Sequence, residues 1–287
     1  MGNLKHDVGI IGNGFVGSAV AHGFGLHANV KIYDSNPNRT THSMAEVVNS
    51  SEFVFVSVPT PMTNVLGGSI DTTILFSVFD EIAELNRRTD NIFIVKSTIV
   101  PGTMESLIRT YPRLNIIHSP EFLTERSARL DFINASRIIL GGEDALLNKV
   151  EPFLRDRFPH VKIIKTDVTT AQFIKYMANC FFSAKVSFMN EMKQAAEVLD
   201  VNWYEAMDGF ISDGRIGNSH LDVPGHDGYR GFGGKCFPKD LNAFIGLFNK
   251  IGVDPKVMTA TWEKNLEVRK EYDWKNIEGA VSKDGDN

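Results

Sequence analysis

The segment VGIIGNGFVGSAVAHGF, residues 8–24, decides the fold of this chain. Its first apolar residues predict a buried strand, and the glycine spacing that follows is typical of a turn leading from a strand into a helix. The first glycine allows the tight turn, the second lets a pyrophosphate approach the backbone, and the third permits close packing of the helix on the strand. The predicted dinucleotide contacts in this turn are Gly12, Asn13, Gly14, Phe15, Val16 and Gly17.

An acidic residue supports the choice of NAD as the cofactor. Asp34 ends the second predicted strand, 20 residues after Gly14. A carboxylate there can accept hydrogen bonds from the adenosine ribose hydroxyls and would repel a 2′-phosphate, so NAD is favoured over NADP. The alternative is a glycine-rich turn in an unrelated α/β protein. Arg39 is a further candidate contact, with a solvated surface arginine as its alternative.

The pattern of apolar runs predicts two domains. Short apolar runs alternate with helical stretches up to residue 140, which is typical of a parallel sheet covered on both faces. The predicted strands are 8–11, 30–33, 53–58, 92–96, 115–118 and 137–140, with a further run at 161–164. We expect a Rossmann doubly wound parallel sheet over residues 1–167, followed by a mainly helical domain over 168–287.

One long helix dominates the expected second domain. Residues 170–199 contain no Pro or Gly, and apolar residues recur at every third or fourth position. A helix of about 30 residues would be about 45 Å long. Because that length exceeds one small domain, we expect the helix to connect domains or to form a subunit interface. Two further helices are predicted at 240–251 and 255–272.

Polar residues follow three of the predicted strands. SVPTP and KSTIVPGT follow the third and fourth strands and contain Thr60 and Thr98, while SPEFLTE follows the fifth and contains Glu121. In an open parallel sheet, ligands bind at the carboxyl ends of the strands. Both threonines are therefore expected to face the cofactor, with ordinary caps and turns as the alternative. Glu121 could act as a general base, or it could be a surface glutamate.

A cysteine in GFGGKCFPKD, residues 231–240, is the candidate nucleophile. Glycines precede Cys236 and a helix is expected after it, with Lys235 and Lys239 adjacent. A helix N-terminus and nearby cations favour the nucleophilic thiolate form. Asp240, one helical turn later, could orient a water or a second side chain. A packing cysteine is the alternative for Cys236.

The long helix carries a second candidate pair. Lys175 and Asn179 are four residues apart, so they project from one side of the helix. A lysine and an amide suit the stabilisation of an oxyanion, with a solvated polar stripe as the alternative. Cys180 lies mid-helix and is predicted to be a packing cysteine.

Composition argues against several other classes. Thirty Lys plus Arg against 35 Asp plus Glu give a net charge of −5, and no basic run is present, so a nucleic-acid partner is not expected. No apolar stretch reaches the roughly 20 residues of a membrane span, and the first residues do not resemble a signal peptide. Two cysteines cannot build a disulfide framework. We expect a cytoplasmic protein with no membrane partner and no metal site.

Seven motifs in order resemble those of the UDP-glucose 6-dehydrogenase family. They are GNGFVG, SVPTP, KSTIVPGT, SPEFLTE, IKYMANCFFSAKVSFMNEM, GRIGN and GFGGKCFPKD, and they cover about residues 7–270. The resemblance implies a Rossmann domain followed by a helical domain, and a homodimer formed through the 170–199 helix. It also implies two successive NAD-dependent oxidations of a nucleotide sugar, most similar to the UDP-glucose branch of the family.

The resemblance assigns chemical roles to individual residues. Cys236 matches a nucleophile that forms a thiohemiacetal and then a thioester. Lys175 and Asn179 match the groups that stabilise the oxyanion, and Glu121 matches the acid/base carboxylate.

Further matches concern the water and the two ligands. Thr98 and Asp240 match groups that position the hydrolytic water, Glu125 matches a residue near the nicotinamide, and Arg215 matches an arginine that reaches a neighbouring subunit's sugar site. The implied substrate contacts are Glu121, Phe122, Leu123, Lys175, Asn179, Arg215, Tyr229, Gly231, Phe232 and Gly233.

The chain departs from the family pattern in length. Family members are usually well over a hundred residues longer and carry a C-terminal Rossmann-like domain that binds the nucleotide half of the substrate. That part could be a separate chain, this chain could be a fragment, or the substrate could be a smaller alcohol. Two other functions stay open: a two-electron β-hydroxyacid dehydrogenase, and a catalytically silent NAD-binding protein.

Overall fold

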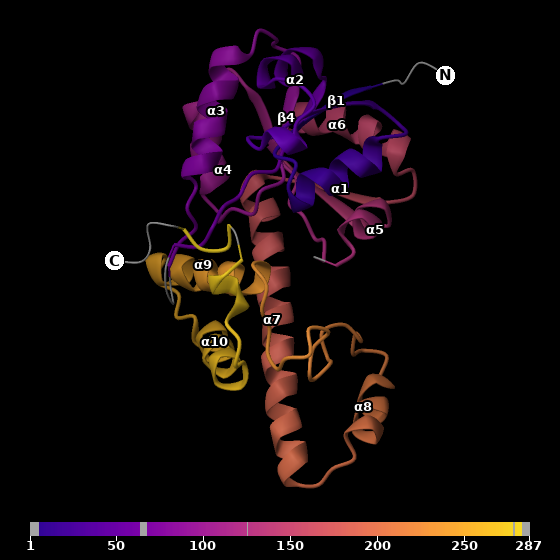
Figure 1. Cartoon of the computed structure of the whole chain (residues 1–287), viewed down its shortest axis with the longest axis vertical. Coiled ribbons are helices and arrows are strands. Elements are labelled where there is room, and N and C mark those ends of the chain that lie inside the picture. The colour runs from indigo at the N-terminus through magenta and orange to yellow at the C-terminus, as the bar shows by residue number, and fades with distance from the viewer. Residues whose placement is uncertain (1–5, 64–67, 125, 278, 283–287) are drawn as a thin grey trace. The chain divides into compact units, whose positions relative to one another are not determined.

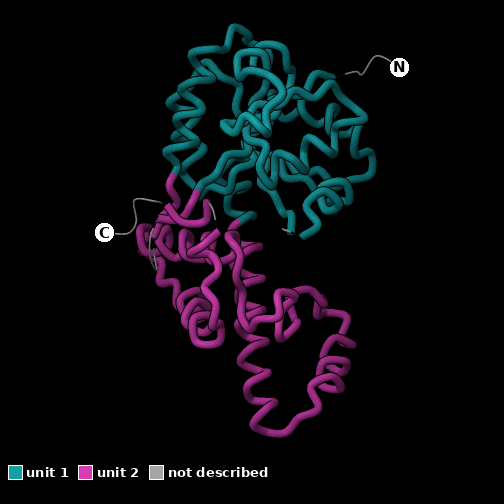
Figure 2. The backbone as a smooth tube through the Cα atoms, in the orientation of Figure 1, with its two compact units in different colours: residues 1–60, 72–175 teal, residues 61–71, 176–287 magenta. Residues whose placement is uncertain are grey.

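The computed structural model describes residues 6–63, 68–124, 126–277 and 279–282 (Figure 1). They group into two compact units, which Figure 2 colours separately. Unit 1 consists of residues 1–60 and 72–175, and unit 2 of residues 61–71 and 176–287. The sequence predicts a single division after residue 167. By contacts, residues 61–71 instead group with the later part of the chain.

Unit 1 is built on a seven-stranded sheet in the order β2-β1-β3-β4-β5-β6-β7. The strands are β1 (Asp7–Ile11), β2 (Asn29–Tyr33), β3 (Phe53–Val56), β4 (Ile92–Val95), β5 (Asn115–His118), β6 (Arg137–Gly141) and β7 (Lys162–Thr166). The central strands β3 and β4 are short, fully buried apolar runs, as expected for strands covered on both faces, whereas the edge strands β2 and β7 are less buried. The predicted fold class, a Rossmann sheet followed by a helical region, is confirmed.

One strand pair differs from the predicted parallel arrangement. β6 runs antiparallel to β5, with His118 opposite Gly141, while the other neighbouring strands are parallel. The chain leaves β5 and enters β6 at the same edge of the sheet, so β6 must run back. A buried apolar strand carries no mark of its direction in the sequence.

Helices cover both faces of this sheet (Figure 1). They are α1 (Phe15–Phe24), α2 (Met44–Ser50), α3 (Thr73–Leu85), α4 (Thr103–Thr110), α5 (Ala128–Ile133) and α6 (Asp144–Arg157), with a short 3-10 turn, η1 (Pro37–Arg39). The core between the sheet and α1, α5 and α6 contains stacked aromatic rings: Phe153 lies 4.2 Å from Phe53 and 4.9 Å from Phe24 between ring centroids. Burial of each such ring contributes about 1.5–3 kcal/mol, so this core holds the strand ends in fixed positions.

Unit 2 is mainly helical. Its helices are α7 (Val168–Val198), α8 (Trp203–Ile211), α9 (Cys236–Lys250), α10 (Lys256–Val268) and the 3-10 turn η2 (Asp273–Lys275), and the first two turns of α7 group with unit 1. The predicted long helix is confirmed, and it begins next to Asp167, whose carboxylate accepts a hydrogen bond from the Thr170 amide at 2.8 Å. Helix α8 was not predicted. Helix α9 begins four residues before the predicted start.

A short segment from early in the chain completes unit 2. Met62 forms isolated β-bridges with Ile70 and Val281, and its amide donates to the Ala280 carbonyl at 2.9 Å. Met62, Ile70 and Ala280 are buried. Residues 61–71 are therefore an integral part of the second unit.

Candidate active site

The glycine turn has the geometry that a dinucleotide requires. Gly12 has φ +86°, and a Cβ on it would lie 2.4 Å from the Ser57 carbonyl oxygen. A Cβ on Gly17 would lie 1.8 Å from the Gly12 carbonyl oxygen, so the helix packs directly on the turn. At Gly14, by contrast, no described atom lies within 4 Å of an added Cβ. No side chain caps α1, so its first amides can bind a phosphate.

Asp34 is fixed beside this turn. Its Oδ2 accepts a hydrogen bond from the Asn13 amide at 2.6 Å, and its Oδ1 accepts one from the Asn36 amide at 2.8 Å. The Asn13 side chain donates to the Arg39 carbonyl at 2.8 Å, while Arg39 itself is exposed in η1. The structure therefore brings the predicted acid, the turn and Arg39 together, and these residues fit a dinucleotide whose ribose hydroxyls are bound by a carboxylate.

The ends of β3 and β4 are tied together by hydroxyl groups. The Thr60 hydroxyl donates to the Thr98 carbonyl at 2.8 Å, and the Ser97 hydroxyl donates to the Val58 carbonyl at 2.8 Å. Thr60 is buried and Thr98 is half-buried. Both predicted threonines thus lie at the carboxyl edge of the sheet, close to the Gly12 turn that packs on Ser57.

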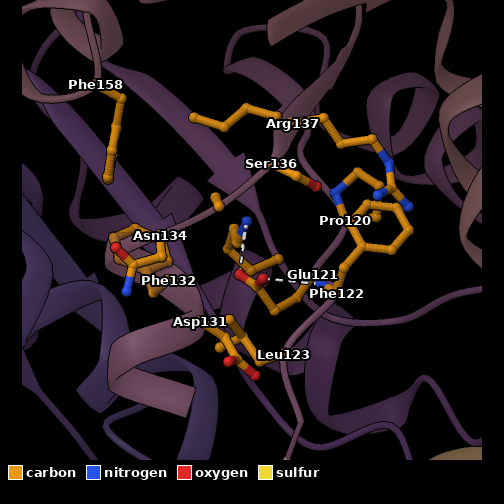
Figure 3. Close-up of a pocket in the computed structure, with 13 residues that line it drawn as sticks. Pro120, Glu121, Phe122, Leu123, Asp131, Phe132, Asn134, Ser136, Arg137 and Phe158 are labelled. Carbon is orange, nitrogen blue, oxygen red and sulfur yellow. Dashed lines mark hydrogen bonds and ion pairs between the residues drawn. The ribbon is translucent and has the colours of Figure 1, made fainter. Parts of the chain in front are cut away.

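A pocket of about 240 Å³ lies at the ends of β4 and β5 (Figure 3). Glu121 lines it, and its Oε2 lies 3.0 Å from Nζ of Lys96, which the sequence analysis did not single out. The side chains are 12% and 6% exposed. Glu121 Oε1 accepts a hydrogen bond from the Phe122 amide at 2.8 Å. Leu123 also lines the pocket. The predicted base is therefore a largely buried, ion-paired carboxylate rather than a surface glutamate.

The Phe122 ring connects this pocket with the long helix. The Arg137 guanidinium lies 4.4 Å from the ring centroid, and Nζ of Lys175 lies 5.4 Å from it. Cation–π contacts of this kind hold a cation in place without neutralising it. Lys175 is buried, so it is not part of a solvated polar stripe.

His118, in the same region, is neutral. Burial, with smaller contributions from the nearby charges of Lys96 and Lys175, lowers its pKa to about 3. Its Nδ1 lies 3.0 Å from the Val95 carbonyl, which can only accept, so Nδ1 carries the proton. His118 therefore adds no charge to the pocket.

Unit 2 contributes the cysteine and its surroundings. Cys236 is the first residue of α9, half-buried and not in a disulfide. The helix dipole at that end favours a negative charge. One turn later, Asp240 is 1% exposed, and its oxygens lie 2.5 Å from Nζ of Lys239 and 2.6 Å from Nδ2 of Asn179. The predicted acid and amide are thus bonded to each other across α7 and α9.

The second cysteine has a different environment. Burial, with the charge of Asp240 as a smaller contribution, raises the pKa of Cys180, and the same two causes raise the pKa of Tyr176. Cys180 is therefore a protonated thiol in the helix interior, which is the packing role that the sequence predicts.

The loop before Cys236 is fixed by residues that the sequence analysis missed. Gly231 has φ +73°, and a Cβ on it would lie 2.4 Å from Oδ1 of Asn265. That oxygen accepts a hydrogen bond from the backbone N–H of Phe232 at 2.7 Å. The side-chain Nδ2 of Asn265 donates to the Phe232 carbonyl at 3.0 Å. The buried Arg269 lies against Gly233 and pairs with Asp273 at 3.2 Å. Asn265 and Arg269 are four residues apart, so they lie on the same side of the helix. That spacing is the sequence feature that could have identified them as a pair.

Comparison with known proteins gives the family. Residues 24–152 match the NAD binding domain of the UDP-glucose/GDP-mannose dehydrogenase family, and residues 169–267 match the central domain of the same family. The chain belongs to this family. The match to its NAD binding domain also confirms NAD as the predicted cofactor.

Two relatives in the dehydrogenase family illustrate the extent of the match. The chain is 29% identical to a UDP-glucose 6-dehydrogenase of Haloferax volcanii, over 92% of this chain and 63% of that protein. It is 33% identical to a UDP-glucose 6-dehydrogenase of Pseudomonas aeruginosa, over 78% of this chain and 51% of that protein. The chain therefore spans about half to two thirds of the length of these relatives.

Solved structures show the same architecture. A UDP-glucose dehydrogenase from Pyrobaculum islandicum matches with a TM-score of 0.78 and 26% identity, over 93% of this chain and 69% of that one. A 3-hydroxyisobutyrate dehydrogenase of Mycobacterium tuberculosis matches with a TM-score of 0.75 over 93% of this chain and 94% of that one. At 17% identity, the second likeness shows the fold alone.

Two predicted residues of the family pattern are exposed in unit 2. Arg215 is exposed and pairs with Asp213 at 2.5 Å, and Tyr229 is exposed in the loop before the cysteine. Glu125 lies outside the described residues. No described helix has the length and apolar character of a membrane span, and no described group of three potential ligands could hold a metal ion.

Proposed function

We propose that this chain oxidises the C6 hydroxyl of a nucleotide sugar to a carboxylate through a covalent intermediate on Cys236. The observation that carries the proposal is the position of Cys236 at the start of α9, one turn before an Asp240 that is bonded to Asn179. Membership of the dehydrogenase family supports it. UDP-glucose is the preferred substrate, because the curated relatives described above carry the name UDP-glucose 6-dehydrogenase.

Residues 1–167 form the NAD-binding domain in this proposal, and residues 168–287 carry the cysteine loop. Bound NAD would accept a hydride from the sugar carbon in each of two oxidations. The amides of the glycine turn and of α1 would bind the pyrophosphate, and Asp34 would bind the adenosine ribose. Thr60 and Thr98 would line the nicotinamide side, because they end neighbouring strands at that edge.

The chain's own residues divide the work of the first oxidation. Glu121, directly or through a water, takes the proton of the C6 hydroxyl as the carbon loses its hydride. Lys175 and Asn179, one turn apart on α7, stabilise the negative charge on that oxygen. The Cys236 thiolate then adds to the aldehyde carbon and forms a thiohemiacetal.

The second oxidation and hydrolysis complete the sequence. Loss of the second hydride converts the thiohemiacetal into a thioester. A water held by Asp240 and Thr98 attacks that carbon, the carbon–sulfur bond breaks, and the thiolate is restored. In total one alcohol, two NAD⁺ and one water give one carboxylate, two NADH and three protons. The covalent bond to Cys236 is what keeps the aldehyde bound between the two oxidations.

We also propose a homodimer through α7. Its unit 2 portion exposes a stripe of apolar side chains, Met177, Phe181, Phe188 and Met192, which are 37–61% exposed. These residues lie three or four residues apart or at multiples of that spacing, so they share one face. The exposed Arg215, which pairs with Asp213 in the chain alone, would reach the neighbouring subunit's sugar in the dimer.

The test counts NADH formed per sugar with UDP-glucose, GDP-mannose and UDP-N-acetylmannosamine. We expect two NADH per UDP-glucose, and we expect Cys236→Ser to lower turnover by several orders of magnitude while NAD binding changes little. Cys180→Ala is the matched control and should keep the two-to-one ratio. One NADH per sugar, together with an active Cys236→Ala protein, would identify a two-electron dehydrogenase instead. NAD binding without any NADH release would identify a silent binding protein.

A further inference from the structure

We propose that Lys96 is a positioning residue for the reaction, which keeps the Glu121 carboxylate ionised and oriented toward its pocket. The inference rests on the proposed function, in which Glu121 is the base. Neither the motif matches nor the family comparison gives Lys96 a role.

The fold places the two residues together. Lys96 follows β4 and Glu121 lies three residues after the end of β5, and these neighbouring parallel strands pair Val95 with His118. The nitrogen–oxygen distance is 3.0 Å, and both side chains are largely buried. Two charges taken out of water cost several kcal/mol each unless they compensate one another, so the pair is not an incidental surface contact.

The pair also fixes the orientation of the carboxylate. Lys96 holds Oε2 and the Phe122 amide donates to Oε1, so the group cannot turn without losing one contact. Each carboxylate oxygen accepts two hydrogen bonds, which leaves capacity for a hydroxyl or a water. Lys96 and Glu121 both line the pocket of about 240 Å³, which has room for water or for part of a ligand (Figure 3). A purely structural ion pair would be enclosed by packing rather than open to a cavity.

The other charged groups near Glu121 are engaged elsewhere. Lys175 and Arg137 lie against the Phe122 ring, and His118 is neutral. Asp131 in α5 accepts hydrogen bonds from the Thr124 hydroxyl at 2.6 Å and from the amide of the same residue. Among the ion pairs of the described residues, Glu121 takes part in the one with Lys96 alone. Loss of that cation would leave a largely buried carboxylate without an ion-pair partner.

A base must be ionised before it can take a proton, which gives the role of Lys96 a kinetic signature. In Lys96→Met, burial without a cation should make the Glu121 carboxyl take up a proton at higher pH than in the wild type. We expect kcat with UDP-glucose to fall about 100-fold at neutral pH with little change in KM, and the acid limb of the pH–rate profile to move up by about one unit. Lys96→Arg should recover most of kcat, because it keeps the charge.

A double-mutant cycle separates positioning from general structure. If Lys96 acts through Glu121, Lys96→Met/Glu121→Gln should be no slower than Glu121→Gln alone. If the fall in kcat of the double mutant equals the product of the falls in the two single mutants, the proposal is overturned. Lys165→Met is the matched control, since Lys165 forms an exposed pair with Glu151 at 2.8 Å in the same unit, and it should leave kcat and the pH profile unchanged.

A measurement without substrate tests Lys96 independently of the proposed function. Infrared difference spectra of the protein without cofactor, recorded against pH, should show a protonated-carboxyl band in Lys96→Met at pH values where the wild type has none. The band should vanish in Lys96→Met/Glu121→Gln. If Lys96→Met does not fold, Lys96→Gln serves in its place. Identical titrations in wild type and variant would overturn the proposal, whereas absence of NADH from the wild-type protein with every sugar would overturn only the proposed function.

Discussion

His118 shows how one buried residue sets a pH response. Its folded-state pKa, about 3, is below the unfolded value of 6.5 because burial disfavours the imidazolium. As the pH falls, the His118 imidazole is therefore protonated at a higher pH in the unfolded chain than in the folded one. The stability that comes from keeping the ring neutral is fully present above pH 6.5 and is lost progressively between 6.5 and 3.

We predict that His118→Gln flattens the acid side of the stability curve. The wild type should lose up to about 4 kcal/mol more than the variant between pH 7 and pH 3, as the shift of the imidazole pKa implies. Urea unfolding at several pH values measures this difference, with His160→Gln as the exposed control. Parallel stability curves for wild type and His118→Gln would contradict the assignment of a neutral, buried ring.

At the scale of elements, α7 makes two separate contributions. Its buried side presents Lys175 and Asn179, and its exposed side presents the apolar stripe defined above. Exposing four large apolar side chains to water costs free energy. In the proposed homodimer the same face of a second copy of the helix buries them.

We predict that Met177→Glu/Phe181→Glu converts the dimer into a monomer, because two charges would be buried without partners in the interface. Light scattering coupled to gel filtration gives the mass directly. Val253→Glu, which changes an exposed apolar residue between α9 and α10, should leave the mass unchanged. A wild type that is already monomeric at micromolar concentration would refute the proposed interface.

How much the sequence could predict depended on the element. The strands of unit 1 and the helix α7 were predictable because apolar periodicity is a local signal. The direction of β6 was not predictable, since a largely buried apolar strand looks the same in either direction. Helix α9 was predicted to begin at Asp240, because the glycines, lysines and proline around its first turn give no apolar periodicity. Cys236 was therefore expected just before the helix, whereas it is the first residue of the helix.

The candidate site was predictable in part for the same reason. Asp34 and the glycine turn are a local pattern, and the structure joins them at the Asn13 amide. Lys96 was missed because its partner is 25 residues away, and only the pairing of β4 with β5 brings the two together. Asn265 and Arg269 were missed because their hydrogen-bond partners lie in a loop whose path no periodicity specifies.

At the scale of the whole molecule, the chain does not divide into two consecutive pieces. Residues 61–71 belong to unit 2, where the Ser282 amide donates a hydrogen bond to the Met62 carbonyl at 2.9 Å. A fragment cut at the predicted boundary would lack this segment.

We predict that residues 168–287 expressed alone melt at a lower temperature, and less cooperatively, than the same residues supplied with a synthetic peptide of residues 61–71. The peptide restores the buried Met62 and Ile70 side chains and the hydrogen bonds to residues 280 and 282. Thermal unfolding followed by circular dichroism measures the effect, with a Met62→Asp peptide as the control. Equal melting curves with and without the peptide would show that the segment is dispensable.

The same segment imposes an order on biosynthesis. In the sequence, Ala280 lies 218 positions after Met62, its hydrogen-bond partner. At about 5–20 residues per second, the ribosome needs roughly 10–45 s to deliver that partner. The Rossmann sheet can therefore assemble early in translation, whereas the helical unit has to wait until residue 280 has been synthesised before it can close.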